Sequence, residues 1–331
     1  MTKSTKSELI RAPLEKFETA YSNISKIINV SPLIYSTWLS NSLEAEIYLK
    51  LECLQPGKSF KIRGAINTLY SSINKPSKVF TASGGNHGLA VTLASKYLNI
   101  PTVVIVPSNT SQNRINLLKN LGAEVQVQGK TWDEANLFGK NLSEKSPNNL
   151  YIHPFDDDLV RYGQGTIALE LRDQLPDIDA VFASVGGGGL LTGISLALES
   201  LGLLPKVKIY AVETKGTDSL DQSLKMNKLA ELPAITSIAT SLGAKKISQY
   251  NFDVLKRLLT KNFVIEDKDA IKSLIDFIDM EKIIIEPATS CIISALFQNK
   301  NIIKGKKVAV IVCGSNVTID DINLWKKQFL N

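Results

Sequence analysis

The chain has 331 residues, 44% of them hydrophobic, and its 38 Lys and Arg against 32 Asp and Glu give a formal net charge of +6. This composition predicts a chain with a substantial core and excludes a disordered or fibrous protein. The basic residues occur in short pairs without interleaved aromatic residues, and no apolar segment reaches the ~20 residues of a membrane span, so we expect neither nucleic acid nor a membrane as a partner.

Short runs of β-branched residues alternate with helix-like segments along the chain. The runs predict strands over residues 46–52, 78–82, 102–106, 123–128, 180–185, 207–213 and 307–312. Helices are predicted over residues 61–73, 86–98, 112–121, 158–175, 190–201 and 319–329. This alternation favours an α/β architecture with largely parallel sheets. No repeat or linker divides the chain, although the polar loop 143–150 could connect two subdomains.

Cysteine and histidine are scarce. The chain has three cysteines, Cys53, Cys291 and Cys313. Because their number is odd and they lack CxxC spacing, the sequence indicates neither a disulfide framework nor a thiolate zinc site. Together with a start that lacks the apolar core of a signal peptide, this favours a cytoplasmic protein. Only His87 and His153 are present, which removes most routes to general-base or metal chemistry through imidazole.

Three glycine-rich turns each follow a predicted strand, at residues 83–88, 186–190 and 313–316. Ligands of open α/β sheets bind at the carboxyl ends of strands, so the three turns could form one pocket. Gly186 to Gly189 precede an apolar helix, and such a turn suits a phosphate because its backbone N–H groups can approach an anion. A Walker A ending and a GxGxxG motif are both missing, which disfavours a nucleotide or a nicotinamide oxidoreductase.

Lys58 and Lys61 stand at the predicted start of a helix, in the segment GKSFKIRGA. Most lysines in such basic turns are solvated surface residues. A catalytic role for either lysine therefore depends on what else the sequence places beside it.

Six ordered motifs supply that context. They are SFKIRGA, SGGNHG, HPFDD with GQGTIALEL, GGGGL, IIEPA and VCGSN. In order and approximate spacing this set resembles the fold-type II pyridoxal-phosphate enzymes, in particular the threonine/serine dehydratase and serine racemase group. The resemblance runs from about Ser31 to the end of the chain. It implies a tryptophan synthase β-like fold of two open, twisted, mostly parallel sheets flanked by helices.

The same resemblance implies a role for each motif residue. Lys61 would hold pyridoxal 5′-phosphate as a Schiff base and move the α-proton. Around the cofactor, the resemblance places Phe60, Asn86, Gly186, Gly187, Gly188, Gly189, Leu190, Glu286 and Cys313. The substrate carboxylate would meet the loop that contains Ser83, Gly84, Asn86 and His87. An uncharged thiol at Cys313, facing the ring nitrogen, limits the electron sink and favours β-elimination.

Two departures separate a lyase from a racemase. Racemases of this group resemble Ser-Ser-Gly-Asn-His at the carboxylate loop and use the second serine as a base, whereas this chain has Gly84 there. Ala135 stands where racemases have an arginine. The sequence therefore favours dehydration and deamination of an L-β-hydroxy amino acid of the threonine or serine class, and racemisation is the alternative.

Other departures leave the substrate and a cation open. Ala239, Thr240 and Ser241 replace the usual Ala-Asp-Gly, so an unusual β-hydroxy amino acid, such as an aryl or carboxylated serine, stays an option. A divalent cation, Mg²⁺ or Ca²⁺, could bind at Glu213 and Thr217, although Ser219 replaces the usual Asp.

The resemblance also bears on organisation. It implies a large cofactor-binding domain of residues 1–80 and 158–331, a small domain of residues 81–157, and a homodimer. The last predicted helix lies at the end of the chain, so no C-terminal regulatory domain is expected. A catalytically silent homologue that only binds the cofactor is the non-enzyme alternative, and the presence of Lys61 argues against it.

Overall fold

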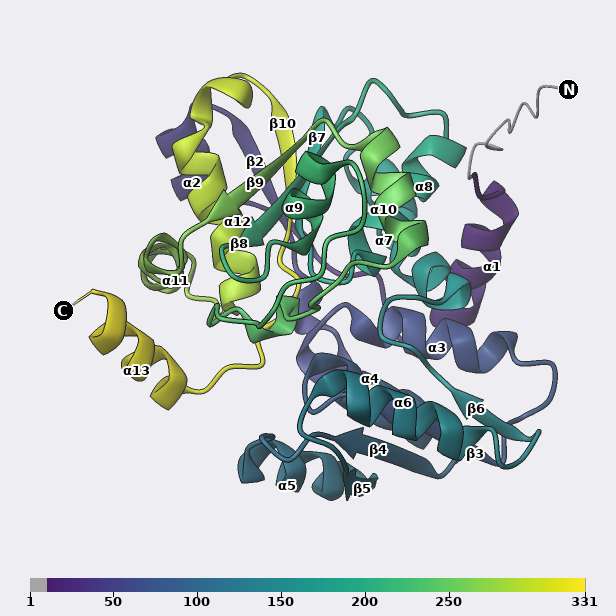
Figure 1. The fold of residues 1–331 in the computed structure, drawn as a ribbon. Helices are drawn as coiled ribbons and strands as arrows, with labels where there is room; N and C mark the ends of the chain where they lie inside the picture. The colour runs from purple at the N-terminus through teal and green to yellow at the C-terminus, as the bar shows by residue number, and fades with distance from the viewer. Residues whose placement is uncertain (1–10, 331) are drawn as a thin grey trace, which may run out of the picture.

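The computed structural model describes residues 11–330 and contains two separate sheets (Figure 1). The larger sheet has the strand order β1-β2-β10-β7-β8-β9 and the smaller one β5-β4-β3-β6. Neighbouring strands are parallel except for β1 and β2, which are antiparallel. Parallel strands need crossover connections, and helices supply them here. The structure confirms the α/β fold with two mostly parallel sheets.

The strands of the larger sheet are β1 (Leu33–Tyr35), β2 (Glu46–Lys50), β7 (Ala180–Ser184), β8 (Lys208–Thr214), β9 (Lys261–Ile265) and β10 (Lys307–Ile311). Those of the smaller sheet are β3 (Lys78–Ala82), β4 (Thr102–Val106), β5 (Glu124–Val127) and β6 (Asn149–Tyr151). Every residue of β4 and β7 is buried, as expected for parallel strands covered on both faces.

Thirteen α-helices lie within the described residues. They are α1 (Leu14–Ile24), α2 (Thr37–Leu43), α3 (Lys61–Ser71), α4 (Asn86–Tyr97), α5 (Gln112–Leu121), α6 (Trp132–Ser143), α7 (Asp158–Gln174), α8 (Gly189–Ser200), α9 (Ser219–Met226), α10 (Gln249–Leu258), α11 (Asp267–Glu281), α12 (Pro287–Gln298) and α13 (Ile319–Phe329). None of the described helices is long and apolar enough to cross a membrane.

The predicted strands and helices agree with the structure to within one or two residues at each end. Other elements were not predicted, among them β1, β6 and helices α1, α6 and α9 to α12. The predicted domain boundary at residue 80 falls inside β3, so the division into residues 81–157 and the remainder stays a prediction. The strands of the smaller sheet all lie between residues 78 and 151.

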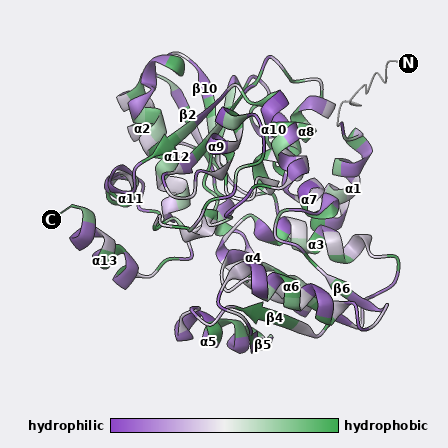
Figure 2. Cartoon of the chain, in the orientation of Figure 1, coloured by the Kyte–Doolittle hydropathy of each residue, from purple (hydrophilic) through white to green (hydrophobic). Residues whose placement is uncertain are grey.

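Hydrophobic residues gather on the strands and on the helix faces that cover them (Figure 2). One large core surrounds the six-stranded sheet, and smaller clusters lie around the four-stranded sheet. Helix α3 lies between the two sheets in Figure 1. Its Ile62 and Ile66 pack in one cluster with Ala90 of α4 and Val160 of α7. The molecule thus has two lobes, one around each sheet. Lys61, the first residue of α3, lies where the two lobes meet.

Candidate active site

Three strands end at the junction of the two lobes, and each leads into one of the predicted glycine-rich turns. Strand β3 leads into the loop before α4, β7 into the glycine loop before α8, and β10 into Cys313. An isolated bridge joins Ser59 to Gly314, and the Phe60 N–H donates to the Cys313 carbonyl at 3.1 Å. The turn that carries Lys61 is thereby attached to the end of β10.

Lys61 is partly buried at the start of α3. Its Nζ donates a hydrogen bond to the Pro154 carbonyl at 2.7 Å and lies 5.2 Å from the centre of the Phe60 ring. Burial lowers the pKa of Lys61 to about 8, from an ordinary 10.5. No carboxylate pairs with this amine among the described residues. Lys61 is therefore available as a neutral amine at mildly alkaline pH.

The glycine loop has no room for side chains. A Cβ on Gly187 would lie 2.2 Å from the Phe155 ring, and one on Gly186 would lie 2.7 Å from the Leu242 carbonyl oxygen. Gly188 has φ +90°, in the left-handed region that favours glycine. The loop runs into α8, where Gly189 and Leu190 are the first two residues. The N-terminus of this helix offers backbone N–H groups and a partial positive charge, which suit a phosphate.

Asn251 fixes the glycine loop to the neighbouring segment. Its Nδ2 donates to the Gly187 carbonyl at 2.7 Å and to the Phe155 carbonyl at 3.1 Å. Arg161 also donates to the Phe155 carbonyl, at 3.2 Å. The loop is thus rigidly placed beside the Pro154 carbonyl that holds Lys61.

The loop after β3 forms the opposite side of the site. Ser83 accepts a hydrogen bond from the Gly85 N–H at 3.2 Å, and Asn86 begins α4. A Cβ on Gly84 would lie 2.7 Å from Cγ2 of Thr110. His87 is buried, and its Nε2 lies 3.1 Å from the Ile152 carbonyl oxygen. Burial and the nearby Lys61 charge hold the pKa of His87 well below its ordinary value, so the ring is neutral.

Asn86 is oriented by a polar network at the lobe junction. Its Nδ2 donates to Glu286 at 2.9 and 3.1 Å, while its Oδ1 accepts from Asn316 at 2.7 Å. Asn316 also donates from its backbone to Glu286 at 2.9 Å and from its side chain to the Gly57 carbonyl at 2.8 Å. The amide nitrogen of Asn86 carries two protons, and its bonds to Glu286 fix the directions in which these protons point.

Cys313 is buried at the end of β10, near two hydroxyl groups. Its Sγ lies 3.2 Å from Oγ1 of Thr289 and 3.6 Å from Oγ of Ser184. Burial, and after it the nearby Glu286 charge, raises the pKa of the Cys313 thiol to about 11. The thiol is therefore uncharged at neutral pH and can serve as a weak donor.

These groups together suit pyridoxal phosphate. The glycine loop suits its phosphate, the low-pKa amine of Lys61 suits its aldehyde, and an uncharged thiol suits a pyridine nitrogen. The sequence comparison agrees, because the family of pyridoxal-phosphate dependent enzymes matches residues 24–314. The chain belongs to this family.

The relatives of this pyridoxal-phosphate dependent enzyme include several ammonia-lyases. An L-threonine ammonia-lyase of Thermotoga maritima is 33% identical over 94% of this chain and 77% of its own length. An L-serine dehydratase/L-threonine deaminase of Bos taurus is 36% identical over 90% of this chain and 94% of its own.

Solved structures show the same fold. The processed form of threonine deaminase isoform 2 from Solanum lycopersicum superposes with a TM-score of 0.87 at 30% identity, covering 99% of this chain and 98% of that one. Maize serine racemase superposes with a TM-score of 0.88 at 27% identity, covering 97% and 98%. The fold alone therefore does not separate lyase from racemase.

At the predicted cation position, Glu213 is already bonded by the protein. Its carboxylate accepts hydrogen bonds from the Leu220 N–H at 2.9 Å, the Asp221 N–H at 2.8 Å and Asn262 Nδ2 at 2.8 Å. Thr217 donates its hydroxyl to the Thr214 carbonyl at 3.1 Å. The described residues contain no group of three or more His, Cys, Asp or Glu that could hold a metal ion. The cation at Glu213 and Thr217 stays a prediction.

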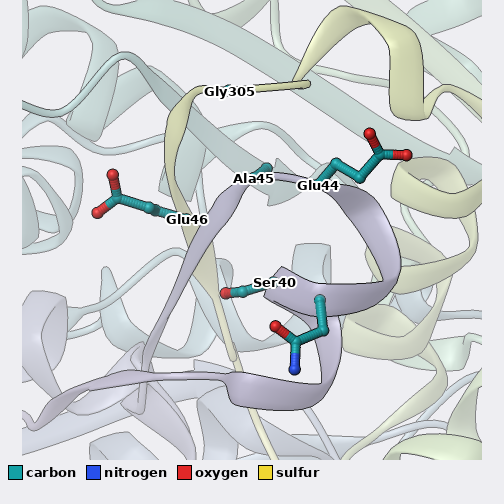
Figure 3. A pocket seen from close by; sticks show the side chains of 6 residues that line it. Ser40, Glu44, Ala45, Glu46 and Gly305 are labelled. Carbon is teal, nitrogen blue, oxygen red and sulfur yellow. The ribbon is translucent and has the colours of Figure 1, made fainter.

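A pocket on the surface of the described residues lies away from this site. Figure 3 shows an open pocket lined by Ser40, Asn41, Glu44, Ala45, Glu46 and Gly305. It lies at the amino ends of β2 and β10, where Lys307 is paired with Glu46 in register. Ligands of parallel α/β sheets bind at the other ends of the strands, where Cys313 and Lys61 lie.

Several residues of the site were not assigned by sequence reasoning. Pro154, Thr289 and Asn316 lie inside or directly beside recognised motifs, but no role was expected for them. Asn251 and Thr110 lie outside any motif. Each acts through a contact with a residue distant in sequence, so no local signal marks it.

Proposed function

We propose that this enzyme is an ammonia-lyase that converts an L-β-hydroxy amino acid of the serine or threonine class into a 2-oxo acid and ammonia. The relatives named L-threonine ammonia-lyase and L-serine dehydratase/L-threonine deaminase support this proposal. When bound, pyridoxal phosphate supplies a ring that withdraws electrons from the substrate α-carbon. The protein must bind the substrate, remove the α-proton and release the β-hydroxyl.

The position and pKa of Lys61 are the observation on which the proposal depends. A general base works best when its pKa is near the working pH, and burial brings the Lys61 pKa to about 8. The Pro154 carbonyl holds Nζ in one place, 2.7 Å away. Both observations support the proposal that Lys61 carries the cofactor and, once free, takes a proton from the α-carbon.

The loop after β3 would bind the substrate carboxylate. Ser83 and Asn86 flank the start of α4, whose N-terminus favours an anion. The family resemblance implies that Gly84 and His87 belong to the same site for the substrate carboxylate. Because the His87 ring is buried against the Ile152 carbonyl, we propose that His87 takes part through its backbone.

Gly84 favours elimination over racemisation. Racemisation by two bases needs a group that delivers a proton to the opposite face of the α-carbon. Gly84 has no side chain, and Thr110 occupies the space that a side chain there would need, 2.7 Å from the Cβ position. A serine racemase-type activity is the second candidate, and the similarity to maize serine racemase is what supports it.

The side-chain pocket of the substrate is less defined. The segment Thr240–Leu242 lies beside the glycine loop, because a Cβ on Gly186 would contact Leu242 at 2.7 Å. Thr240 and Ser241 give this segment no charge. A bulkier β-hydroxy amino acid such as an aryl serine therefore belongs in the substrate panel beside serine and threonine.

The experiment is a coupled assay for 2-oxo acid and ammonia with L-serine, L-threonine and other β-hydroxy amino acids. We expect Lys61→Ala to lose activity by a factor of about 10³ or more. Lys58→Ala is the matched control, because Lys58 is an exposed lysine in the same turn. Product formation by Lys61→Ala at the rate of the unmodified enzyme would refute the mechanism, and inactivity on every substrate would support a silent homologue.

We further propose that the enzyme acts in the cytoplasm as a homodimer. The three cysteines are free and buried, in keeping with a reducing compartment. The dimer is implied by the family resemblance. Light scattering on the purified holoenzyme tests it, and a monomer mass at micromolar concentration would contradict it.

A further inference from the structure

Two hydroxyl groups and one thiol form a buried cluster behind the site. Thr289 is the third residue of α12, Ser184 ends β7, and Cys313 follows β10. Their side chains are at most 4% exposed, and Cys313 Sγ lies 3.2 Å from Thr289 Oγ1 and 3.6 Å from Ser184 Oγ. In such a dry place a polar proton without a partner costs free energy, so a hydrogen bond that gives it one is favoured.

The protons of Thr289 can be accounted for. The Cys313 N–H donates to Thr289 Oγ1 at 3.1 Å, so this oxygen is already an acceptor. Its own hydroxyl proton must point elsewhere. Among the contacts of the described residues, Cys313 Sγ is the one acceptor within reach of that proton. Either atom could be the donor in this contact, and among the contacts of the described residues only donation by Thr289 gives its proton a partner.

The thiol keeps its proton at working pH. Burial raises the pKa of Cys313 to about 11. A thiol has one proton, and its sulfur accepts weakly. If Thr289 donates to the sulfur, the S–H bond cannot point at Thr289 and is left to point toward another group, which in the cofactor-free protein can be Ser184 Oγ at 3.6 Å.

We propose that Thr289 is a positioning residue for Cys313: its hydroxyl binds the sulfur, and the S–H proton is thereby directed to the pyridine nitrogen of the bound cofactor. Ser184 supports the sulfur from a second side at longer range. The contact is fixed by backbone, because the Thr289 N–H donates to the Glu286 carbonyl at 2.8 Å in the first turn of α12. The proposal rests on the proposed function, in which Cys313 faces the cofactor ring.

The test is infrared spectroscopy of the S–H stretch, with and without cofactor. The band of Cys313 is identified by its loss in Cys313→Ser. We expect pyridoxal phosphate to shift this band to lower frequency in the unmodified protein, because the S–H group then donates to the ring nitrogen. In Thr289→Val the shift should be lost or broadened, and in Thr289→Ser it should be retained. The kcat of Thr289→Val should fall by up to about tenfold, the value of one hydrogen bond.

Thr192→Val is the matched control, because Thr192 is also fully buried and its hydroxyl has no partner among the described residues. It should leave the band and its shift unchanged. The proposal is overturned if Thr289→Val keeps the cofactor-induced shift, whatever its melting temperature. It is also overturned if the cofactor-free band rises in frequency in Thr289→Val, since the S–H group would then have been donating to Thr289. If the S–H band behaves as expected but the enzyme releases no ammonia, the proposed lyase activity is refuted and the role of Thr289 is not.

Discussion

The Nζ of Lys61 donates a hydrogen bond to the carbonyl oxygen of Pro154 at 2.7 Å, across 93 residues of sequence. Pro154 lies between β6 of the smaller sheet and α7, whereas Lys61 begins the helix that lies between the two sheets. The contact therefore places the reactive amine at the junction of the two lobes.

The low pKa of Lys61 predicts the pH dependence of cofactor attachment. Only the neutral amine adds to an aldehyde, and below pH 8 Lys61 is mostly protonated. The rate at which cofactor-free protein takes up pyridoxal phosphate should thus rise about tenfold per pH unit below that value and level off above it. Stopped-flow absorbance measures this rate. The control is Nα-acetyl-lysine, whose side-chain amine has an ordinary pKa. An uptake rate of the protein that still rises toward pH 10 would contradict the lowered pKa of Lys61.

Gly187→Ala should weaken both folding and cofactor binding. The new methyl group would lie 2.2 Å from the Phe155 ring, and overpacking of this kind costs about 1–3 kcal/mol. Chemical denaturation measures the free energy of unfolding, and a fluorescence titration measures the affinity for pyridoxal phosphate. Gly202→Ala is the control for affinity, because nothing lies within 4 Å of its Cβ position. Its φ of +71° means that this substitution costs stability as well, but it should leave the affinity for pyridoxal phosphate unchanged. If the added Phe155→Ala change restores no affinity, the clash is not the cause.

Thr110 should limit how readily a second base can be installed. Gly84→Ser alone places a Cβ 2.7 Å from Thr110 Cγ2, so the serine is displaced. We expect Gly84→Ser with Thr110→Ala to raise the ratio of D-serine to 2-oxo acid at least about tenfold, because a positioned base contributes at least that much. Chiral chromatography measures the ratio. Equal ratios in the single and double variants would show that Thr110 does not restrict the site, and Thr110→Ala alone should not racemise.

The hydrogen bonds of Glu213 predict that divalent cations have little effect on the stability of the protein. The Leu220 and Asp221 N–H groups occupy its two oxygens, so a cation would have to displace them. We expect millimolar Ca²⁺ or Mg²⁺ to leave the melting temperature unchanged. Ser219→Asp adds a second carboxylate and should gain about 2 °C or more with Ca²⁺. A saturable rise in the unmodified protein, reversed by a chelator, would show instead that the cation site is intact.

Sequence alone determined most of the regular architecture. The runs at 78–82 and 102–106 and the helix at 112–121 were predicted with the bounds that the structure has, because β-branched strands and glycine boundaries are local signals. The six motifs likewise pointed to the family and the cofactor, since Lys61 and the four glycines carry their chemistry in residue type and order.

Only the tertiary structure decided which groups act on one another. The contacts of Lys61 with Pro154, of Thr110 with the Gly84 position and of Thr289 with Cys313 join residues 24 to 93 positions apart. The low pKa of Lys61 likewise arises from burial between the lobes, which residue type does not encode. Residue type and spacing thus specified the chemistry available to this chain, and long-range packing set the distances and the dielectric environment in which that chemistry operates.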